Sequence, residues 1–307
     1  MPRRRSAVCT ALTRIHDKRV IYLITVNYDS AELIKTLLAS IQPSFEIAHR
    51  FVIVNNSPSD RQIHTLATDS VRILEAGNNL GFGGGCNLGL QWVFEQDRRA
   101  IVWLINPDTT LQPDSLLKAG NFCRAHPELS IMGTIVREPD GKIWFAGGEF
   151  QPENGRIVAI ETLPKFDGDY IETAWVTGCS LLLNLQNFAV CPQFDPDYFL
   201  YYEDFDFCHR YAKQGHSIVI TNHIQITHQP SSITGRNLAL KVQLSTTSYL
   251  LALERHTYPT VLLYRLSRIL FHALRVSLVE PEKAIAIIKG VLQYLKRVRG
   301  LGKFNHG

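Results

Sequence analysis

Two acidic segments, one in each half of the chain, carry the residues best able to do chemistry. Asn106-Pro107-Asp108 follows the apolar run 101–105, and Glu203-Asp204-Phe205-Asp206 follows the aromatic-rich run 198–202. A carboxylate at the carboxyl end of a buried strand sits where open α/β sheets bind ligands, and a second acidic cluster can face it across the cleft. Magnesium and manganese prefer oxygen ligands and often share them with substrate phosphates. The two segments therefore predict a metal-held phosphate leaving group opposite a general base.

Each of these signals also has an ordinary explanation. Asn-Pro-Asp is a common turn sequence, and acids in the first turn of a helix are stabilised by its dipole without any catalysis. Asp206 and Arg210 have the i,i+4 spacing of a surface ion pair. A lone histidine such as His228 is more often structural than a ligand. No single signal decides the function; their order along the chain does.

Size and composition limit the class of protein. A chain of 307 residues with 45% hydrophobic content can bury a substantial core. The net charge of +4 is mild, and no run of arginines interleaved with aromatics indicates a nucleic-acid binder. The six cysteines are scattered without a C-x-x-C pair, as expected for reduced, mostly buried thiols in the cytosol.

Neither a signal peptide nor a membrane span is predicted. The basic segment 1–19 lacks a long apolar stretch and is expected to be a mobile tail. No run reaches the roughly 18 consecutive apolar residues that a membrane-spanning helix needs. The catalytic body is therefore expected to be soluble.

The first half of the chain alternates strand and helix patterns. Strands are expected at 20–26, 51–54, 71–75 and 101–105, with helices at 31–41, 87–96 and 113–124. Short βα repeats of this kind imply a largely parallel sheet covered on both faces. After residue 131, glycine pairs and short apolar runs indicate hairpins and an antiparallel extension, with further strands at 174–183 and 217–221 and a helix at 203–214. A boundary is expected near Gly235.

The region 236–307 reads as basic and helical. Within 261–279, Arg265, Arg268, His272 and Arg275 fall on one helical stripe, and 284–299 repeats the theme. Such helices can lie in an anionic membrane interface. They can equally form a helical subdomain that packs on the core and turns a basic face to water. The sequence leaves both interpretations open.

The glycine-rich segment 78–87 fits a dinucleotide-binding loop poorly. The third glycine is replaced by Cys86, the segment follows the third strand instead of the first, and no acidic residue ends the next strand at the required place. A nicotinamide enzyme is therefore disfavoured. The glycines either let the backbone approach a ligand closely or form a purely structural tight loop.

The order of the motifs resembles glycosyltransferase family 2, and within it the rhamnosyltransferase-like branch, over residues 20–235. The segments that carry the resemblance are 25–28 (Thr-Val-Asn-Tyr), 52–57, 79–87, 104–108, 175–179, 194–195 and 199–206, with His228 and Ser232 closing the pattern. The resemblance implies a GT-A fold, with a mostly parallel central sheet flanked by helices, a small antiparallel extension and a C-terminal helical appendage. Residues 20–130 would form the nucleotide-binding half and 131–235 the acceptor and catalytic half, leaving 236–307 as the basic helical region.

The resemblance also implies a role for each matched residue. The nucleotide pocket would be lined or shaped by Thr25, Asn27, Tyr28, Asn55, Asn79, Gly81, Phe82 and Asn87. Asp108, with Asn106 nearby and His228 opposite, would hold Mn²⁺ or Mg²⁺ on the diphosphate. Asp204 would be the catalytic base and Glu203 would position the base or the acceptor. The boundary between donor sugar and acceptor would be formed by Trp175, Gly178 and Cys179.

Two positions depart from the family pattern. Asn55 stands where the family usually has an aspartate that binds the nucleobase, which puts the nucleobase preference in doubt. Cys86 and Cys179 stand where small or amide residues are commoner in the family, and these differences are interpreted as variation in packing. The implied metal and base residues are intact.

The implied reaction is an inverting transfer from a nucleotide-diphosphate sugar, either dTDP-rhamnose or a UDP-sugar, to a glycan or lipid-linked glycan. A single in-line displacement needs one carboxylate to deprotonate the acceptor, and a metal to neutralise the departing diphosphate. The expected location is the cytoplasm, peripheral at the inner face of the cell membrane through 258–299, and the sequence is compatible with a homodimer.

Two other functions stay open. A nucleotidyltransferase would want a basic phosphate-gripping signature near the first loop, and Asn27-Tyr28-Asp29 offers none. A non-catalytic protein that binds sugar nucleotides or glycans in an assembly complex is slightly favoured by Asn55 and disfavoured by the intact Asp204.

Overall fold

The computed structural model describes residues 20–41, 47–230 and 237–298. The expectations for the tail 1–19, for Ser232 and for a boundary near Gly235 lie outside these ranges. The main sheet contains β1 (Ile21–Asn27), β2 (His49–Asn55), β3 (Val71–Glu75), β4 (Ile101–Ile105), β5 (Thr109–Leu111), β6 (Ile131–Arg137), β7 (Ile143–Phe145), β10 (Ile171–Glu172), β11 (Ser180–Asn184) and β12 (Ile218–His228). A hairpin of β8 (Gly148–Gln151) and β9 (Arg156–Ala159) forms a second, antiparallel sheet.

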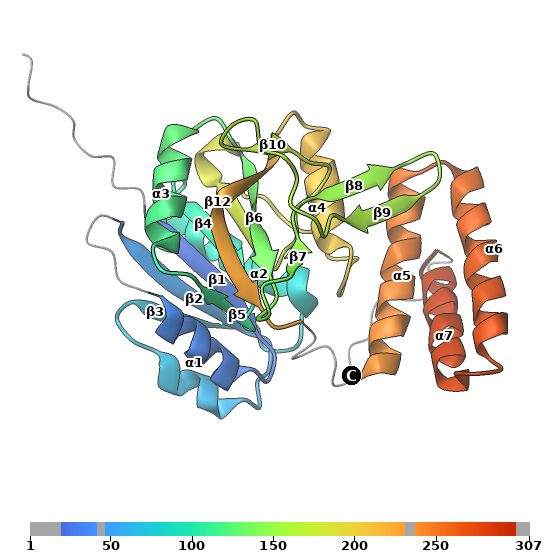
Figure 1. The fold of residues 1–307 in the computed structure, drawn as a ribbon. Helices are drawn as coiled ribbons and strands as arrows, with labels where there is room; N and C mark the ends of the chain where they lie inside the picture. The colour runs from blue at the N-terminus through green and yellow to red at the C-terminus, as the bar shows by residue number, and fades with distance from the viewer. Residues whose placement is uncertain (1–19, 42–46, 231–236, 299–307) are drawn as a thin grey trace, which may run out of the picture.

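The helices are α1 (Ala31–Ser40), α2 (Gly81–Gln96), α3 (Ser115–Ala125), α4 (Glu203–Ala212), α5 (Leu238–His256), α6 (Pro259–Val276) and α7 (Pro281–Val298). Helix α2 packs on β1 and β2, and α3 packs on β12. Helices α5, α6 and α7 pack against one another and stand beside the sheet, next to the β8–β9 hairpin (Figure 1).

The order of the main sheet is β10-β12-β6-β11-β4-β1-β2-β3. From β3 to β4 the strands are parallel; β11 then runs antiparallel to both β4 and β6, and β6 is parallel to β12. The parallel strands are continuous apolar runs because both faces are covered, and Leu23, Val52 and Trp103 are fully buried. The predicted α/β architecture, with its small antiparallel extension and C-terminal helices, is confirmed.

The glycine-rich segment is not the loop that the sequence suggested. Helix α2 begins at Gly81, so the glycines form its first turns. A Cβ on Gly85 would lie 2.8 Å from Cγ1 of Val26, and a Cβ on Gly89 would lie 2.7 Å from Cγ2 of Ile24. The glycines therefore let α2 pack closely on β1, and tertiary packing outweighs their low helix propensity.

Three other boundaries differ from the sequence-based expectation. Strand β11 begins at Ser180, so the start of the predicted 174–183 strand is a loop. Strand β12 continues beyond residue 221 as far as His228. Helix α3 follows Asp114, so Pro113 precedes the helix instead of occupying its first turn.

The five cysteines in the described ranges are free thiols, and four of them are buried. Among the helices that the structure describes, none is both long and apolar enough to cross a membrane.

Candidate active site

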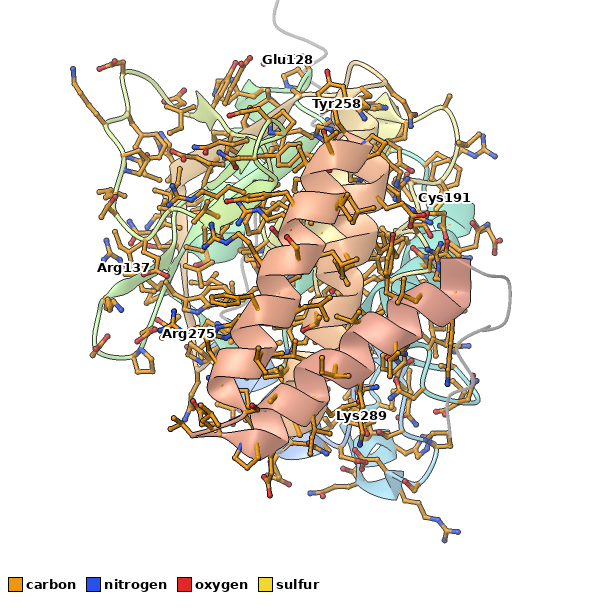
Figure 2. The ribbon with its side chains drawn as sticks, turned by 90° about the vertical axis from the view of Figure 1, so that its right-hand side faces the viewer. Glu128, Arg137, Cys191, Tyr258, Arg275 and Lys289 are labelled. Atoms are coloured by element: carbon orange, nitrogen blue, oxygen red, sulfur yellow. The ribbon has the colours of Figure 1, made fainter. Side chains whose placement is uncertain are left out.

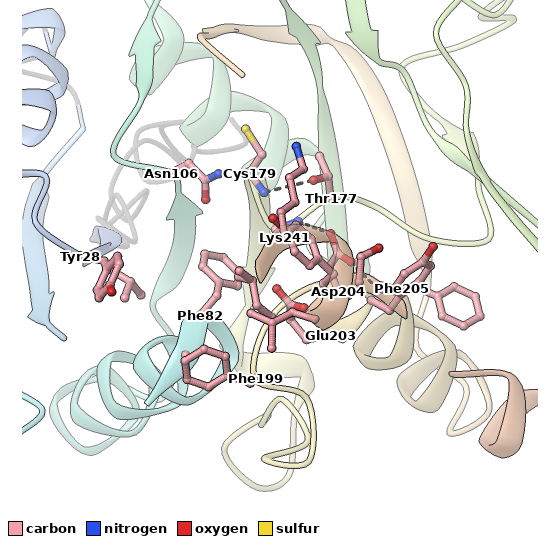
Figure 3. Close-up of a pocket in the computed structure, with 18 of the residues that line it drawn as sticks. Tyr28, Phe82, Asn106, Thr177, Cys179, Phe199, Glu203, Asp204, Phe205 and Lys241 are labelled. Atoms are coloured by element: carbon pink, nitrogen blue, oxygen red, sulfur yellow. Dashed lines mark hydrogen bonds between the residues drawn. The ribbon is translucent and has the colours of Figure 1, made fainter. Parts of the chain in front are cut away.

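A cavity of about 1360 Å³ lies between the carboxyl ends of the sheet strands and the C-terminal helices. It runs from Tyr28 at the end of β1, past Asp108 and Asp204, to the side chains of α5 and α7. Figure 3 shows Glu203 and Asp204 at the start of α4, with Phe82, Thr177 and Cys179 around them and Tyr28 set apart. The structure thus brings the two acidic segments to one cavity.

One end of the cavity is formed by residues predicted to shape the nucleotide pocket. Tyr28 is 45% exposed and lines the cavity, as do Asn79, Gly81 and Phe82. The side chain of Asn79 accepts a hydrogen bond from the Gly81 N–H (3.0 Å), and Asn56 Nδ2 donates to the Gly81 carbonyl (2.8 Å). The second bond joins the start of α2 to the residue that follows β2.

Four other predicted nucleotide residues do not line the cavity. Thr25 is buried in β1, and Asn87 binds the backbone of Phe194 through both ends of its amide. Asn27 and Asn55 are fully buried and hydrogen-bonded to each other, Nδ2 to Oδ1, at 3.0 Å. In this arrangement these side chains support the cavity wall from behind.

Asp108 and His228 form the predicted metal pair. Strand β5 pairs with β12 so that Thr109 lies opposite His228, and this register places Oδ1 of Asp108 3.2 Å from Nε2 of His228. Both side chains are almost fully buried, and Oδ1 of Asp108 and Nδ1 of His228 make no hydrogen bond. Asn106 lines the cavity beside them.

The donor set suits a metal that takes its remaining ligands from a substrate. No cluster of three or more His, Cys, Asp or Glu side chains able to hold a metal occurs within 20–41, 47–230 and 237–298. Mg²⁺ and Mn²⁺ are often held by one or two carboxylates together with substrate phosphates and water. An orphaned carboxylate oxygen beside an imidazole fits that mode of binding.

Both carboxylate oxygens of Asp204 accept hydrogen bonds from the backbone. The Gly178 N–H donates to its Oδ2 (3.0 Å), and the Phe205 N–H donates to its Oδ1 (2.8 Å). Burial raises the pKa of Asp204 above its ordinary value, and these backbone hydrogen bonds oppose the rise by stabilising the carboxylate.

The neighbouring Glu203 lies in a different environment. Its side chain is buried, and Oε2 has no hydrogen-bond partner. Burial, and then the charge of Asp204, raise the pKa of Glu203 well above its ordinary value. The pKa is therefore raised at both adjacent carboxyls, and more backbone hydrogen bonds oppose the rise at Asp204 than at Glu203.

A tight turn directly precedes Glu203 and Asp204. Tyr201 (φ 70°) and Tyr202 (φ 63°) adopt left-handed backbone conformations directly before Glu203. Two consecutive non-glycine residues in this region are unusual, and strain of this kind is found at functional sites.

The loop 175–179 connects the two acidic segments. The Cys179 carbonyl accepts a hydrogen bond from the Asn106 N–H (3.0 Å), and the preceding Gly178 donates to Asp204. Burial, followed by the charges of Asp108 and Asp204, raises the pKa of the Cys179 thiol well above its ordinary value. Cys179 and Gly178, with Trp175 on the cavity wall, thus stand between the predicted metal pair and the base.

Asp206 is not part of a surface pair. It is fully buried, and its carboxylate lies 2.7 Å from Nε of Arg210 and 2.8 Å from Nε2 of His256 on α5. Although burial acts in the opposite direction, His256 and Arg210 hold the pKa of Asp206 below its ordinary value. The i,i+4 ion pair that the spacing indicates is therefore present, but its carboxylate is buried instead of lying at the surface, because α5 covers this side of α4.

Several cavity residues were missed by sequence reasoning. Thr177 lies inside a quoted motif and accepts from the Cys179 N–H (3.3 Å), so it could have been named. Lys241, Gln293 and Lys296 line the far end of the cavity from α5 and α7. No motif marks them, because their place depends on how the C-terminal helices dock.

The profile of glycosyl transferase family 2 matches residues 22–181. The low-salt glycan biosynthesis hexosyltransferase Agl10 of Haloferax volcanii is 25% identical over 206 residues, which are 64% of this chain and 62% of that protein. The rhamnosyltransferase WbbL of Escherichia coli is 25% identical over 213 residues, 64% of this chain and 78% of that protein. The chain thus matches less than two thirds of the length of the Haloferax relative.

A crystal structure of GalNAc-T7 with UDP, GalNAc and Mn²⁺ superposes with a TM-score of 0.57 at 9% identity, over 93% of this chain and 58% of that one. At this identity the likeness concerns the fold alone. The sheet and its flanking helices have the GT-A fold. The chain belongs to glycosyltransferase family 2.

Proposed function

We propose that this protein is an inverting, metal-dependent glycosyltransferase with Asp204 as its general base. The observation that carries the proposal is the hydrogen bonding of Asp204, whose two oxygens each accept a backbone N–H in the cavity that also holds Asp108 and His228. Such a carboxylate is fixed in direction and can take the proton of an acceptor hydroxyl as the hydroxyl attacks the anomeric carbon.

The remaining residues divide between donor and acceptor. Asp108 and His228 would hold Mn²⁺ or Mg²⁺, which when bound neutralises the charge of the departing diphosphate. Tyr28, Asn79 and Phe82 would contact the nucleotide, and Glu203 would position the acceptor or the base. We assign residues 20–130 to donor binding, 131–235 to the acceptor half and 236–307 to the helical region.

The donor and acceptor are proposed from the relatives. The name of the Escherichia coli relative supports rhamnose as the transferred sugar, for which we propose dTDP-rhamnose as the donor. The UDP bound to GalNAc-T7 supports a UDP-sugar as the second choice. The Haloferax relative acts in glycan biosynthesis, which supports a glycan or lipid-linked glycan acceptor. We place the reaction in the cytoplasm, at the inner face of the cell membrane.

The test combines donor binding with turnover. Thermal unfolding is followed against a panel of nucleoside diphosphates and sugar nucleotides, with and without Mn²⁺. A ligand at a hundredfold excess over its Kd stabilises the folded state by about 2.7 kcal/mol. A metal-dependent rise in Tm with one nucleotide therefore supports the donor site and identifies the preferred nucleobase. Turnover is then compared between the wild type and Asp204→Asn.

Asp204→Asn should lower turnover by about 10²- to 10⁴-fold, while the nucleotide-dependent rise in Tm is retained. Asp167→Asn is the matched control, because Asp167 is exposed and lies outside the cavity. Unchanged transfer by Asp204→Asn would contradict the assignment of the base. A nucleotide shift without transfer by the wild type would favour the non-catalytic binding protein.

A further inference from the structure

The outer face of α6 and α7 is apolar and exposed. Of the residues of α6, only Val261 and Ala273 are buried. Leucines at 263, 270 and 274 are all exposed, Phe271 is 62% exposed, and Leu278 in the turn before α7 is 88% exposed. Helix α7 adds Ile285 and Leu292. Figure 2 shows both helices crossing the side of the molecule that faces the viewer, with no other helix or strand of the described residues in front of them. We call this surface the α6–α7 face.

The side chains of α6 are sorted into three sectors. At 100° per residue, Leu263, Leu270 and Leu274 form one exposed stripe, and Phe271 follows it on one side. Arg268 and Arg275, seven residues apart, run along the edge of this stripe and are exposed. Arg265 instead turns inward and donates to the Asn154 carbonyl. The predicted basic stripe thus lies beside an exposed apolar stripe instead of forming a solvated face alone.

Charge decides what can cover this face. Residues 258–298 contain seven Lys and Arg residues against two Glu residues. A twofold contact between two copies would bring the same basic residues of both chains together, whereas an anionic surface attracts them. An amphipathic helix with basic residues beside its apolar face is the type that lies in a membrane interface.

We propose that the α6–α7 face docks onto an anionic phospholipid membrane. Leu274, Phe271 and Leu278 enter the boundary between headgroups and acyl chains, and Arg268, Arg275 and Lys289 meet the phosphates. This surface is independent of glycosyl transfer. One consequence rests on the proposed function: Gln293 and Lys296 of α7 line the cavity, so docking would hold the cavity near the lipid headgroups, where a lipid-linked acceptor presents its glycan.

The experiment is flotation of the full chain with vesicles of phosphatidylcholine alone and of phosphatidylcholine mixed with phosphatidylglycerol. The wild type is expected to float with the anionic vesicles and to be released in part by salt, because exposed charges are screened. Leu274→Asp/Leu278→Asp should abolish flotation. Arg268→Glu/Arg275→Glu should weaken partitioning by more than about tenfold.

Matched controls separate docking from folding and from catalysis. Val190→Asp and Lys165→Glu change exposed residues elsewhere and should float like the wild type. Each variant is checked for the thermal shift with nucleotide, so that a folding defect is recognised. Since vesicle binding and nucleotide binding are measured separately, failure of one leaves the other standing.

Two results would overturn the proposal. One is equal flotation of the wild type and both double variants. The other is no flotation of the wild type with anionic vesicles; if light scattering then shows a dimer that Leu274→Asp/Leu278→Asp dissociates, the face is a contact between copies.

Discussion

Asn55 makes a set of hydrogen bonds that an aspartate could not make. Its Nδ2 donates to Glu75 (2.9 Å), and its Oδ1 accepts from Asn27 Nδ2 (3.0 Å) and from the Ser57 N–H (3.1 Å). An aspartate would set a second carboxylate against Glu75. Asparagine instead of the aspartate usual in the family therefore suits Glu75, the residue at the end of the next strand, because the amide can donate to its carboxylate.

Asn55→Asp is accordingly expected to destabilise the fold by about 1–3 kcal/mol, because it loses a part-buried hydrogen bond to a charged group and places a buried carboxylate next to Glu75. Restoring the donor–acceptor match with Asn55→Asp/Glu75→Gln should recover most of the loss. Urea unfolding of the two single variants and the double variant measures the coupling. Additive effects of the two changes would contradict the pairing.

Glu203 should impose a pH dependence on stability. Its folded-state pKa lies well above the ordinary value of 4.5, so the folded state binds more protons than the unfolded state above that pH. The stability that Glu203 contributes is full below pH 4.5 and is lost as the pH rises through its folded pKa. Glu203→Gln should flatten this fall while retaining far more turnover than Asp204→Asn, as urea unfolding from pH 4 to 8 and transfer assays will measure. A wild-type slope that is unchanged in Glu203→Gln would refute the assignment.

At the scale of elements, the sequence predicted best where one periodicity dominates. Strands β3 and β4 have the predicted bounds because each is a short apolar run between turn residues. Helix α2 was predicted too short, because its glycines are helical only through their packing on β1. The loop 175–179 was taken for a strand because it is apolar, and its hydrogen bonds to Asn106 and Asp204 have no local signature.

In the candidate site, too, local motifs predicted some residues, whereas the positions set by tertiary packing were not predicted. Motif order named Asp108, His228 and Asp204, which the structure brings to one cavity. A motif does not tell which way a side chain at a strand end points. Thr25, Asn27 and Asn55 were therefore expected to line the pocket, whereas in the structure they are buried behind its wall. The residues of α5 and α7 could not be found, since only the docking of these helices brings them there.

For the whole molecule, the contact between α4 and the C-terminal helices matters most. Leu251 and Ala252 of α5 pack on Tyr198 and Phe205, and Phe205 directly follows Asp204. Asp206 of α4 adds polar contacts to α5: its Oδ1 lies 2.8 Å from Nε2 of His256 and 3.9 Å from a guanidinium nitrogen of Arg255. The helical region is therefore joined to α4, the helix that begins with Glu203 and Asp204.

Asp206→Asn tests this joint. It would leave Arg210 and His256 without their shared anion, and breaking a buried ion pair from one side costs about 3 kcal/mol or more. The lower figure is expected because 28% of the Arg210 side chain remains in water. The folded pKa of Asp206 is lowered, so its contribution is present at neutral pH and is lost as the pH falls through that folded value. Urea unfolding at pH 7 should therefore show the full loss, against a change within about 0.5 kcal/mol for the exposed Asp167→Asn. Equal small effects of the two substitutions would mean that the buried carboxylate does not hold α5 to α4, and that apolar packing alone joins the helices to the catalytic half.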